Sequence, residues 1–125
     1  MKKRLVVIVI AAIIILTALS TRTVEAKSSA TNFYVGSESG TVTAIINSNY
    51  STKTTSTYSL TSAKVCSRNR SYYYDTTGQL MNLTDKKSQT GGYVAVNLTV
   101  ESYLVKVKAL GGPGTTELVS VTCTN

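Results

Sequence analysis

The stretch YVAVNLTVESYLVKVKA, residues 93–109, decides the fold class, because apolar and polar side chains alternate along most of it. A period of two places one side of a β-strand in a core and the other in water, as in antiparallel sheets. The apolar positions are even-numbered through Val100 and odd-numbered from Tyr103. Such a period changes phase only at a turn or a bulge, so Glu101-Ser102 marks a tight hairpin, a bulge or a wider turn. Neither residue favours positive φ, which argues for the bulge or the wider turn.

The same alternation extends outward to TVTAIIN at 41–47 and ELVSVTC at 117–123. Stretches rich in Gly, Asn, Asp, Ser and Pro separate these segments and predict turns or loops. They are residues 36–40, 47–56, 75–78, 85–92 and 110–116. About seven short strands with this spacing predict a single small antiparallel β-sandwich, with a small β-barrel as the alternative. The Ser/Thr-rich run 51–62 is expected to be an edge strand or a long loop.

The first 26 residues have the pattern of a secretory signal peptide. Three basic residues (2–4) precede an apolar run, residues 5–19, and Val24-Glu25-Ala26 provides a signal-peptidase site. An uncleaved membrane anchor is the alternative, but fifteen helical residues span only about 22 Å of a hydrocarbon core of about 30 Å. We therefore expect a cleaved signal peptide (1–26) and a secreted all-β domain (27–125), with no stable membrane insertion after cleavage.

The charge of the exported part is modest. The whole chain has a net charge of +7, but residues 27–125 hold nine basic and five acidic residues, a net charge of +4. Together with export and the lack of a nucleic-acid-binding motif, this value argues against a nucleic-acid partner.

Cys66 and Cys123 are the two cysteines of the chain, and both lie in the exported part. An even cysteine count in an exported domain favours a disulfide between them. The alternatives are two free thiols or a metal pair. Because the chain has no histidine and no CxxC motif, we expect no metal site.

The chain lacks the residues that most catalytic mechanisms need. The absence of histidine removes Ser-His-Asp and Cys-His arrangements. Three of the five carboxylates in the exported part lie in expected turns, where acidic residues are common (Glu38, Asp75 and Asp85). No phosphate loop or dinucleotide fingerprint occurs. We therefore expect neither an enzyme nor a cofactor.

The stretch VCSRNRSYYYDTTGQL, residues 65–80, holds the candidate binding residues. If it is a strand, Tyr72 and Tyr74 share one face and Tyr73 the other. We expect Tyr72 and Tyr74 to be the more buried, as ordinary strand aromatics. Tyr73 would then form an exposed patch with Arg68 and Arg70 that binds a ligand, unless the stretch is scaffold alone. Lys106 and Lys108, on the wet face of their strand, would extend this patch or protect an edge strand from pairing.

These observations predict a secreted, non-catalytic β-sandwich that binds a partner at or outside the cell surface of a bacterium. The partner would be a cell-wall glycan, an anionic polymer or a surface protein. The alternative is a secreted antagonistic, bacteriocin-like factor.

Overall fold

The computed structural model describes residues 26–125. The expected signal peptide, residues 1–26, lies outside the described residues except for Ala26. Within the described part, no helix has the length and apolar character that crossing a bilayer needs.

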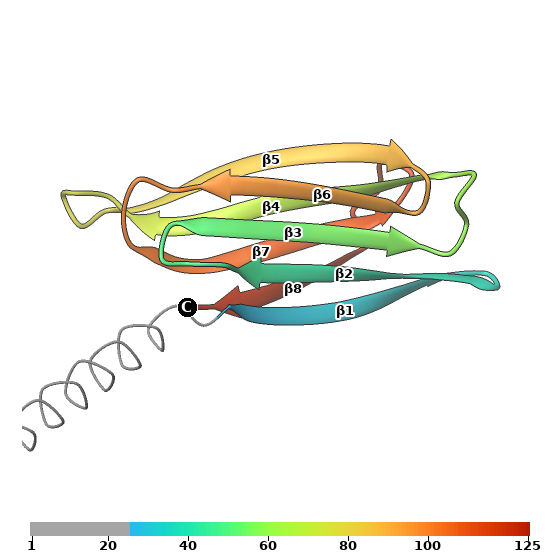
Figure 1. Ribbon diagram of the computed structural model, residues 1–125, viewed down its shortest axis with the longest axis horizontal. Coiled ribbons are helices and arrows are strands. Elements are labelled where there is room, and N and C mark those ends of the chain that lie inside the picture. The colour runs from blue at the N-terminus through green and yellow to red at the C-terminus, as the bar shows by residue number, and fades with distance from the viewer. Residues whose placement is uncertain (1–25) are drawn as a thin grey trace, which may run out of the picture.

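Between Ala26 and Asn125 the chain forms eight β-strands and no helix, which confirms the predicted all-β fold. The strands are β1 (Lys27–Val35), β2 (Glu38–Ile46), β3 (Ser51–Tyr58), β4 (Lys64–Tyr74), β5 (Leu80–Thr90), β6 (Tyr93–Thr99), β7 (Leu104–Pro113) and β8 (Val119–Thr124). Sheet A has the strand order β1-β2-β3-β6 and sheet B the order β5-β4-β7-β8. All neighbouring strands are antiparallel, and the two sheets pack face to face (Figure 1).

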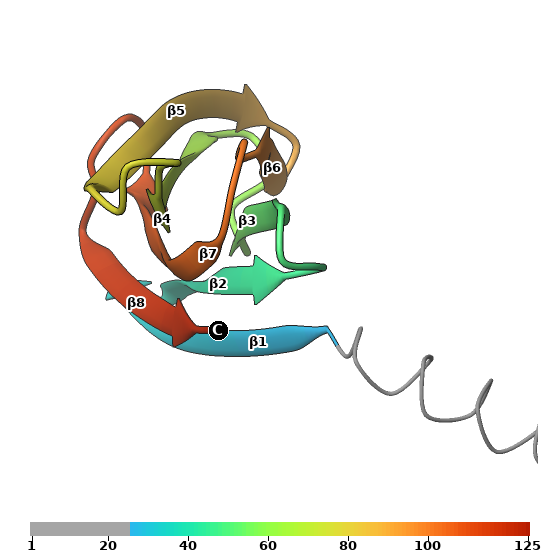
Figure 2. The same cartoon turned by 90° about the vertical axis from the view of Figure 1, so that its left-hand side faces the viewer.

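The two sheets approach each other at both edges, as Figure 2 shows. β1 lies beside β8 at one edge, and β5 lies beside β6 at the other. The hydrogen-bonded ladders nevertheless do not continue from one sheet into the other. The molecule is therefore the predicted β-sandwich and not the alternative barrel.

Three connections cross between the sheets. The chain passes from sheet A to sheet B between β3 and β4, returns to sheet A between β5 and β6, and enters sheet B again between β6 and β7. β3 pairs with β6 in one sheet, while β4 pairs with β7 in the other. The stretch 65–80 therefore begins on a central strand of sheet B, flanked on both sides.

The apolar core lies mainly between β2 and β7. Phe33 of β1 packs against Tyr58 of β3 with ring centroids 5.4 Å apart. A Cβ atom on Gly40 would lie 2.2 Å from a ring carbon of Phe33, so this position accommodates only glycine while the ring stays in place. The fully buried apolar side chains of β2 and β7 are Val42, Ala44, Ile46, Leu104, Val107 and Ala109.

Two segments expected to be loops or edges have different roles. The run 51–62 contains β3, which is a central strand of sheet A and not an edge strand. Threonine is β-branched and favours strands. The inward hydroxyl groups of Thr52 and Thr54 bond to side chains of β4, whereas the buried Ser56 hydroxyl group has no hydrogen-bond partner among the described residues. Most of residues 85–92 belongs to β5, which is an edge strand and is exposed along almost its whole length. Its polar composition reflects that exposure and not a loop.

The predicted disulfide between Cys66 and Cys123 is wrong, because both cysteines are free and buried. Cys66 on β4 pairs with Gly112 of β7, and Cys123 on β8 pairs with Val107 of the same strand. β7 thus lies between the two cysteines, and their partner positions are five residues apart along it. With strands about 4.8 Å apart and a rise of about 3.4 Å per residue, the Cα atoms are separated by roughly 19 Å. A disulfide requires less than about 7 Å.

Candidate functional site

The tyrosine run of β4 faces the opposite way from the prediction. Tyr73 is partly buried and packs against the core, whereas Tyr74 is 45 % exposed. Tyr72 also lies on the outer face, where Lys106 covers its ring. The prediction failed because it assigned the phase from the large aromatic residues alone.

The inward positions of β4 carry small polar side chains, on the face that the predicted phase of Tyr73 would have placed in solvent. Ser67, Asn69 and Ser71 are fully buried. The Asn69 side-chain amide donates to Thr52 Oγ1 (3.0 Å) and to the Val96 carbonyl oxygen (3.2 Å). Thr52 Oγ1 and Ser71 Oγ lie 2.7 Å apart, and Ser71 Oγ donates to Asn69 Oδ1 (2.7 Å). The three side chains thus close a ring of hydrogen bonds that joins the two sheets, and no water is needed to satisfy them.

The outer face of sheet B holds two of the three predicted binding residues. Arg68 and Arg70 point outward from β4, while Tyr73 points inward. The predicted patch of Arg68, Arg70 and Tyr73 is therefore not assembled, because neighbouring residues of a strand face opposite sides. Tyr72 takes the outward position beside Arg70.

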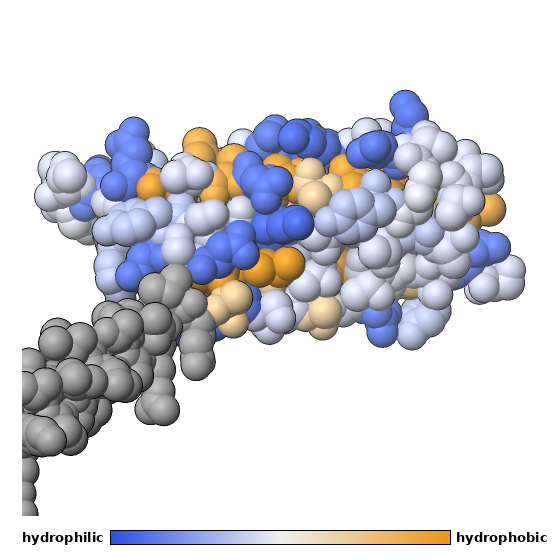
Figure 3. All heavy atoms as spheres, in the orientation of Figure 1, coloured by the Kyte–Doolittle hydropathy of each residue, from blue (hydrophilic) through white to orange (hydrophobic). Residues whose placement is uncertain are grey.

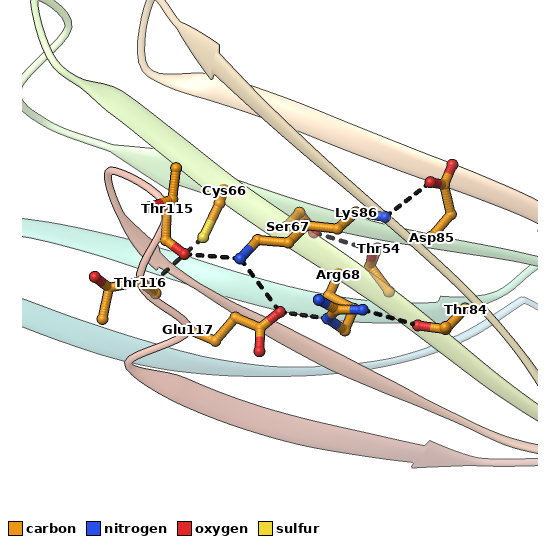
Figure 4. A network of polar contacts seen from close by, with 10 residues as sticks. All are labelled: Thr54, Cys66, Ser67, Arg68, Thr84, Asp85, Lys86, Thr115, Thr116 and Glu117. Carbon is orange, nitrogen blue, oxygen red and sulfur yellow. Dashed lines mark hydrogen bonds and ion pairs between the residues drawn. The ribbon is translucent and has the colours of Figure 1, made fainter.

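One end of this outer face is covered by the connection between β7 and β8 (Figure 4). Glu117 of this connection accepts a hydrogen bond from Arg68 and lies 3.6 Å from Lys86 Nζ. Lys86 also donates to the Thr115 carbonyl oxygen at 2.7 Å. The hydrogen bond from Arg68 and the two nearby cations lower the pKa of Glu117 below its usual value. We call Arg68, Lys86 and Glu117 the loop clamp.

Cys66 lies under the same connection. Its thiol donates to the Thr116 carbonyl oxygen at 3.4 Å, and the side chain is fully buried although it points to the outer face. Burial raises the pKa of this thiol. Because the thiolate is the reactive form, Cys66 is a structural and not a reactive cysteine.

The centre of the outer face carries cations without carboxylate partners. Arg70 of β4 lies directly opposite Lys108 of β7. Lys106 Nζ lies 4.9 Å from the centre of the Tyr72 ring. Within residues 26–125 the ion pairs involve Glu117 with Arg68 and Lys86, and Arg70, Lys106 and Lys108 take part in none. We call Arg70, Lys106 and Lys108 the open cations.

The outward orientation of Lys106 and Lys108 agrees with the predicted alternation. Their suggested role in protecting an edge strand does not hold, since β7 is paired on both sides. A central strand needs no protection against pairing with other chains.

A bulge in β7 turns a further tyrosine onto this face. Tyr72 pairs with Lys106, but Tyr73 pairs with Leu104, so Val105 is the extra residue. Leu104 is consequently buried and its neighbour Tyr103 is 62 % exposed. The Tyr74 backbone amide donates to the Tyr103 carbonyl oxygen at 3.0 Å, which places the two tyrosines opposite each other.

The sequence had suggested the change of phase, but at Glu101-Ser102 and with Tyr103 on the apolar side. In the structure, residues 100–103 form the wide connection between the sheets, and the bulge follows within β7. The sequence therefore indicated that the alternation changes phase near Tyr103, but it did not indicate at which residue the change occurs.

The outer face of sheet A differs in composition. Figure 3 views the molecule from this side: pale, weakly hydrophilic side chains cover mainly its right half, strongly hydrophilic ones gather left of the centre, and apolar ones show above and below that group. Thr41 and Thr43 of β2 lie opposite Thr57 and Thr55 of β3. Lys53 is the outward-facing cation of these two strands. The cations of the described chain are thus concentrated on sheet B.

Among residues 26–125, no three His, Cys, Asp or Glu side chains gather into a group that could hold a metal ion. No family model, no curated protein and no solved structure matches this chain.

Proposed function

We propose that this protein is an exported, non-catalytic binding protein that holds an anionic polymer of the cell surface or its surroundings on the outer face of sheet B. The observation that carries the proposal is the cluster of open cations, Arg70, Lys106 and Lys108, on two adjacent central strands. The signal-peptide pattern supports export, and the proposal includes no catalytic step.

The pairing of Arg70 with Lys108 favours an anionic ligand. Like charges directly opposite each other across a sheet destabilise it. The loop clamp leaves these two residues without a carboxylate, since Glu117 already binds Arg68 and Lys86. A bound anion would remove the repulsion, so the arrangement costs stability in the free protein and contributes affinity in the complex.

The test is binding of the purified protein to two linear polyanions, polygalacturonate and polyphosphate, across a range of salt concentrations. We expect binding that weakens as salt rises, because the polymer releases counterions when cations of the protein replace them. The double variant Lys106→Ala/Lys108→Ala should flatten the dependence of log affinity on log salt by about two units.

The matched control is Lys27→Ala/Lys53→Ala, which removes the same charge from sheet A and should leave the salt slope nearly unchanged. The proposal would be overturned if the protein bound neither of the two polymers. Equal losses in the two double variants would also overturn it, because the attraction would then come from net charge alone.

A further inference from the structure

From the row of side chains next to the open cations, we infer that the ligand is an acidic polysaccharide, whose sugar rings stack on Tyr74 and Tyr103 while its anionic groups reach Arg70 and Lys108. This inference rests on the proposed function and names the class of polymer.

The outer face of sheet B changes character row by row along β4. The first cross-strand row, which we call the aromatic row, holds Leu80, Tyr74 and Tyr103. The second holds Asn82, Tyr72, Lys106 and Thr124. The third holds Thr84, Arg70, Lys108 and Thr122. Rows on one face are about 6.8 Å apart, so the aromatic row lies roughly 14 Å from the Arg70 row, a distance that an extended polymer can span.

The aromatic row offers a ring-sized apolar surface. Tyr74 is 45 % exposed and Tyr103 is 62 % exposed. The backbone hydrogen bond between Tyr74 and Tyr103 holds these two exposed residues next to each other at one end of β4. Aromatic faces bury apolar area at low cost in conformational entropy, and the hydroxyl groups remain in water. The apolar C–H face of a sugar ring fits such a surface, whereas a polymer without rings gains nothing from it.

The bulge at Val105 supports a role for the aromatic row. With regular pairing, Tyr73 would oppose Val105, and Tyr103 would then point into the sandwich. The bulge places Leu104 in the core and brings Tyr103 beside Tyr74. Bulges are common next to functional sites, where they redirect a side chain. Here the bulge buries Leu104 and exposes the large aromatic side chain of Tyr103.

The second and third rows also hold groups suited to sugar hydroxyls. Asn82, Thr122 and Thr124 are exposed and flank Tyr72 and the open cations. Such side chains both donate and accept hydrogen bonds. Aromatic surface, hydroxyl partners and cations thus occur in sequence along one face, matching a chain that bears rings, hydroxyls and carboxylates.

The experiment compares polygalacturonate, which has a ring and a carboxylate in every unit, with polyphosphate, which has no ring. We expect Tyr74→Ala/Tyr103→Ala to weaken polygalacturonate binding at least about tenfold, the loss expected from removing two stacking partners. Polyphosphate binding should change less than about twofold, because the open cations are intact. Tyr74→Phe/Tyr103→Phe keeps the rings and should retain the affinity of the wild type for both polymers.

The matched control is Tyr34→Ala, which removes a tyrosine that is 71 % exposed on the far side, in β1 of sheet A, and should change neither affinity. Equal or absent effects of the Tyr74/Tyr103 variant on the two polymers would overturn the inference, while the proposed function stands as long as Lys106→Ala/Lys108→Ala weakens both. If Lys106→Ala/Lys108→Ala weakens binding to neither polymer, the proposed function is overturned and the inference with it. Light scattering could also show that the purified protein is a dimer and that Tyr74→Ala/Tyr103→Ala is a monomer. That result would overturn the inference, because a second copy of the chain would then cover the aromatic row.

Discussion

The two faces of β4 carry polar side chains in opposite circumstances. On the inner face, Ser67, Asn69 and Ser71 are fully buried, and their polar atoms are bonded to each other or to sheet A. On the outer face, Arg70 has no carboxylate partner within the described chain and Tyr74 is nearly half exposed. Residue polarity therefore does not distinguish a stabilising position from a surface position on this strand. The partners available to each side chain do.

This difference separates two kinds of consequence. A change on the inner face leaves buried groups without partners, which lowers the stability of the fold. A change among the open cations or the aromatic row removes exposed groups that are not held in the buried hydrogen-bond ring, so under the proposed function we expect it to lower binding while the fold remains. Three stability measurements test this separation, from the largest expected effect to the smallest.

Asn69→Ala should have the largest effect. It removes the side-chain donor to the Val96 carbonyl oxygen and the acceptor of the Ser71 hydroxyl group, which keeps Thr52 as its partner inside the sandwich. The lost buried hydrogen bonds and the cavity left by the shortened side chain should together lower the free energy of unfolding by about 2 to 4 kcal/mol in a denaturant titration. Asn97→Ala, an exposed asparagine on sheet A, is the control and should stay within about 0.5 kcal/mol of the wild type. Similar values for the two variants would mean that the buried ring of hydrogen bonds contributes nothing.

Tyr73→Ala should have an intermediate effect. Its ring packs against the core but is only partly buried, so we expect a loss of about 2 kcal/mol, below the range for a fully buried aromatic residue. Tyr74→Ala, one residue along on the outer face, should cost less than about 0.5 kcal/mol. The reverse order in thermal or denaturant unfolding would place Tyr74 inside and overturn the observed register.

Glu117→Gln should have the smallest effect, because the two ion pairs of the loop clamp are partly exposed. Such pairs stabilise by at most about 1 kcal/mol, so the variant should lose no more than that at pH 7. The hydrogen bond from Arg68 lowers the pKa of Glu117 in the folded protein, so this contribution is present above the ordinary carboxyl pKa. It should disappear as pH falls below about 4.3 and through the lowered pKa, where both proteins carry an uncharged side chain. A difference that persists at low pH would assign the effect to packing and not to charge.

The strands with strict apolar alternation were predictable in position and orientation. In β2 and β6, the even-numbered apolar residues from Val42 to Ile46 and from Val94 to Val96 are buried as expected. β-branched residues at a period of two have few other ways to bury their apolar area. The sandwich architecture and the outward orientation of Lys106 and Lys108 follow from the same pattern.

The candidate site was only partly predictable. Arg68 and Arg70 do lie on an outer face, but the structure uses Arg68 in the loop clamp and turns Tyr73 inward. Tyr103 reaches the surface through a bulge that depends on where Leu104 finds space in the core. No local pattern records the partner that decides each of these outcomes.

The sequence by itself therefore determined the all-β class, the approximate positions of the apolar strands and the excess of cations over carboxylates. The tertiary structure alone decided the phase of β4, the separation of Cys66 from Cys123 and the exposure of Tyr103. The physical reason is that a period of two always has two phases, and the choice between them depends on the opposite sheet. On β4 that choice is made by hydrogen bonds between Asn69 and residues 17 and 27 positions away in the chain, which satisfy polar groups inside the sandwich.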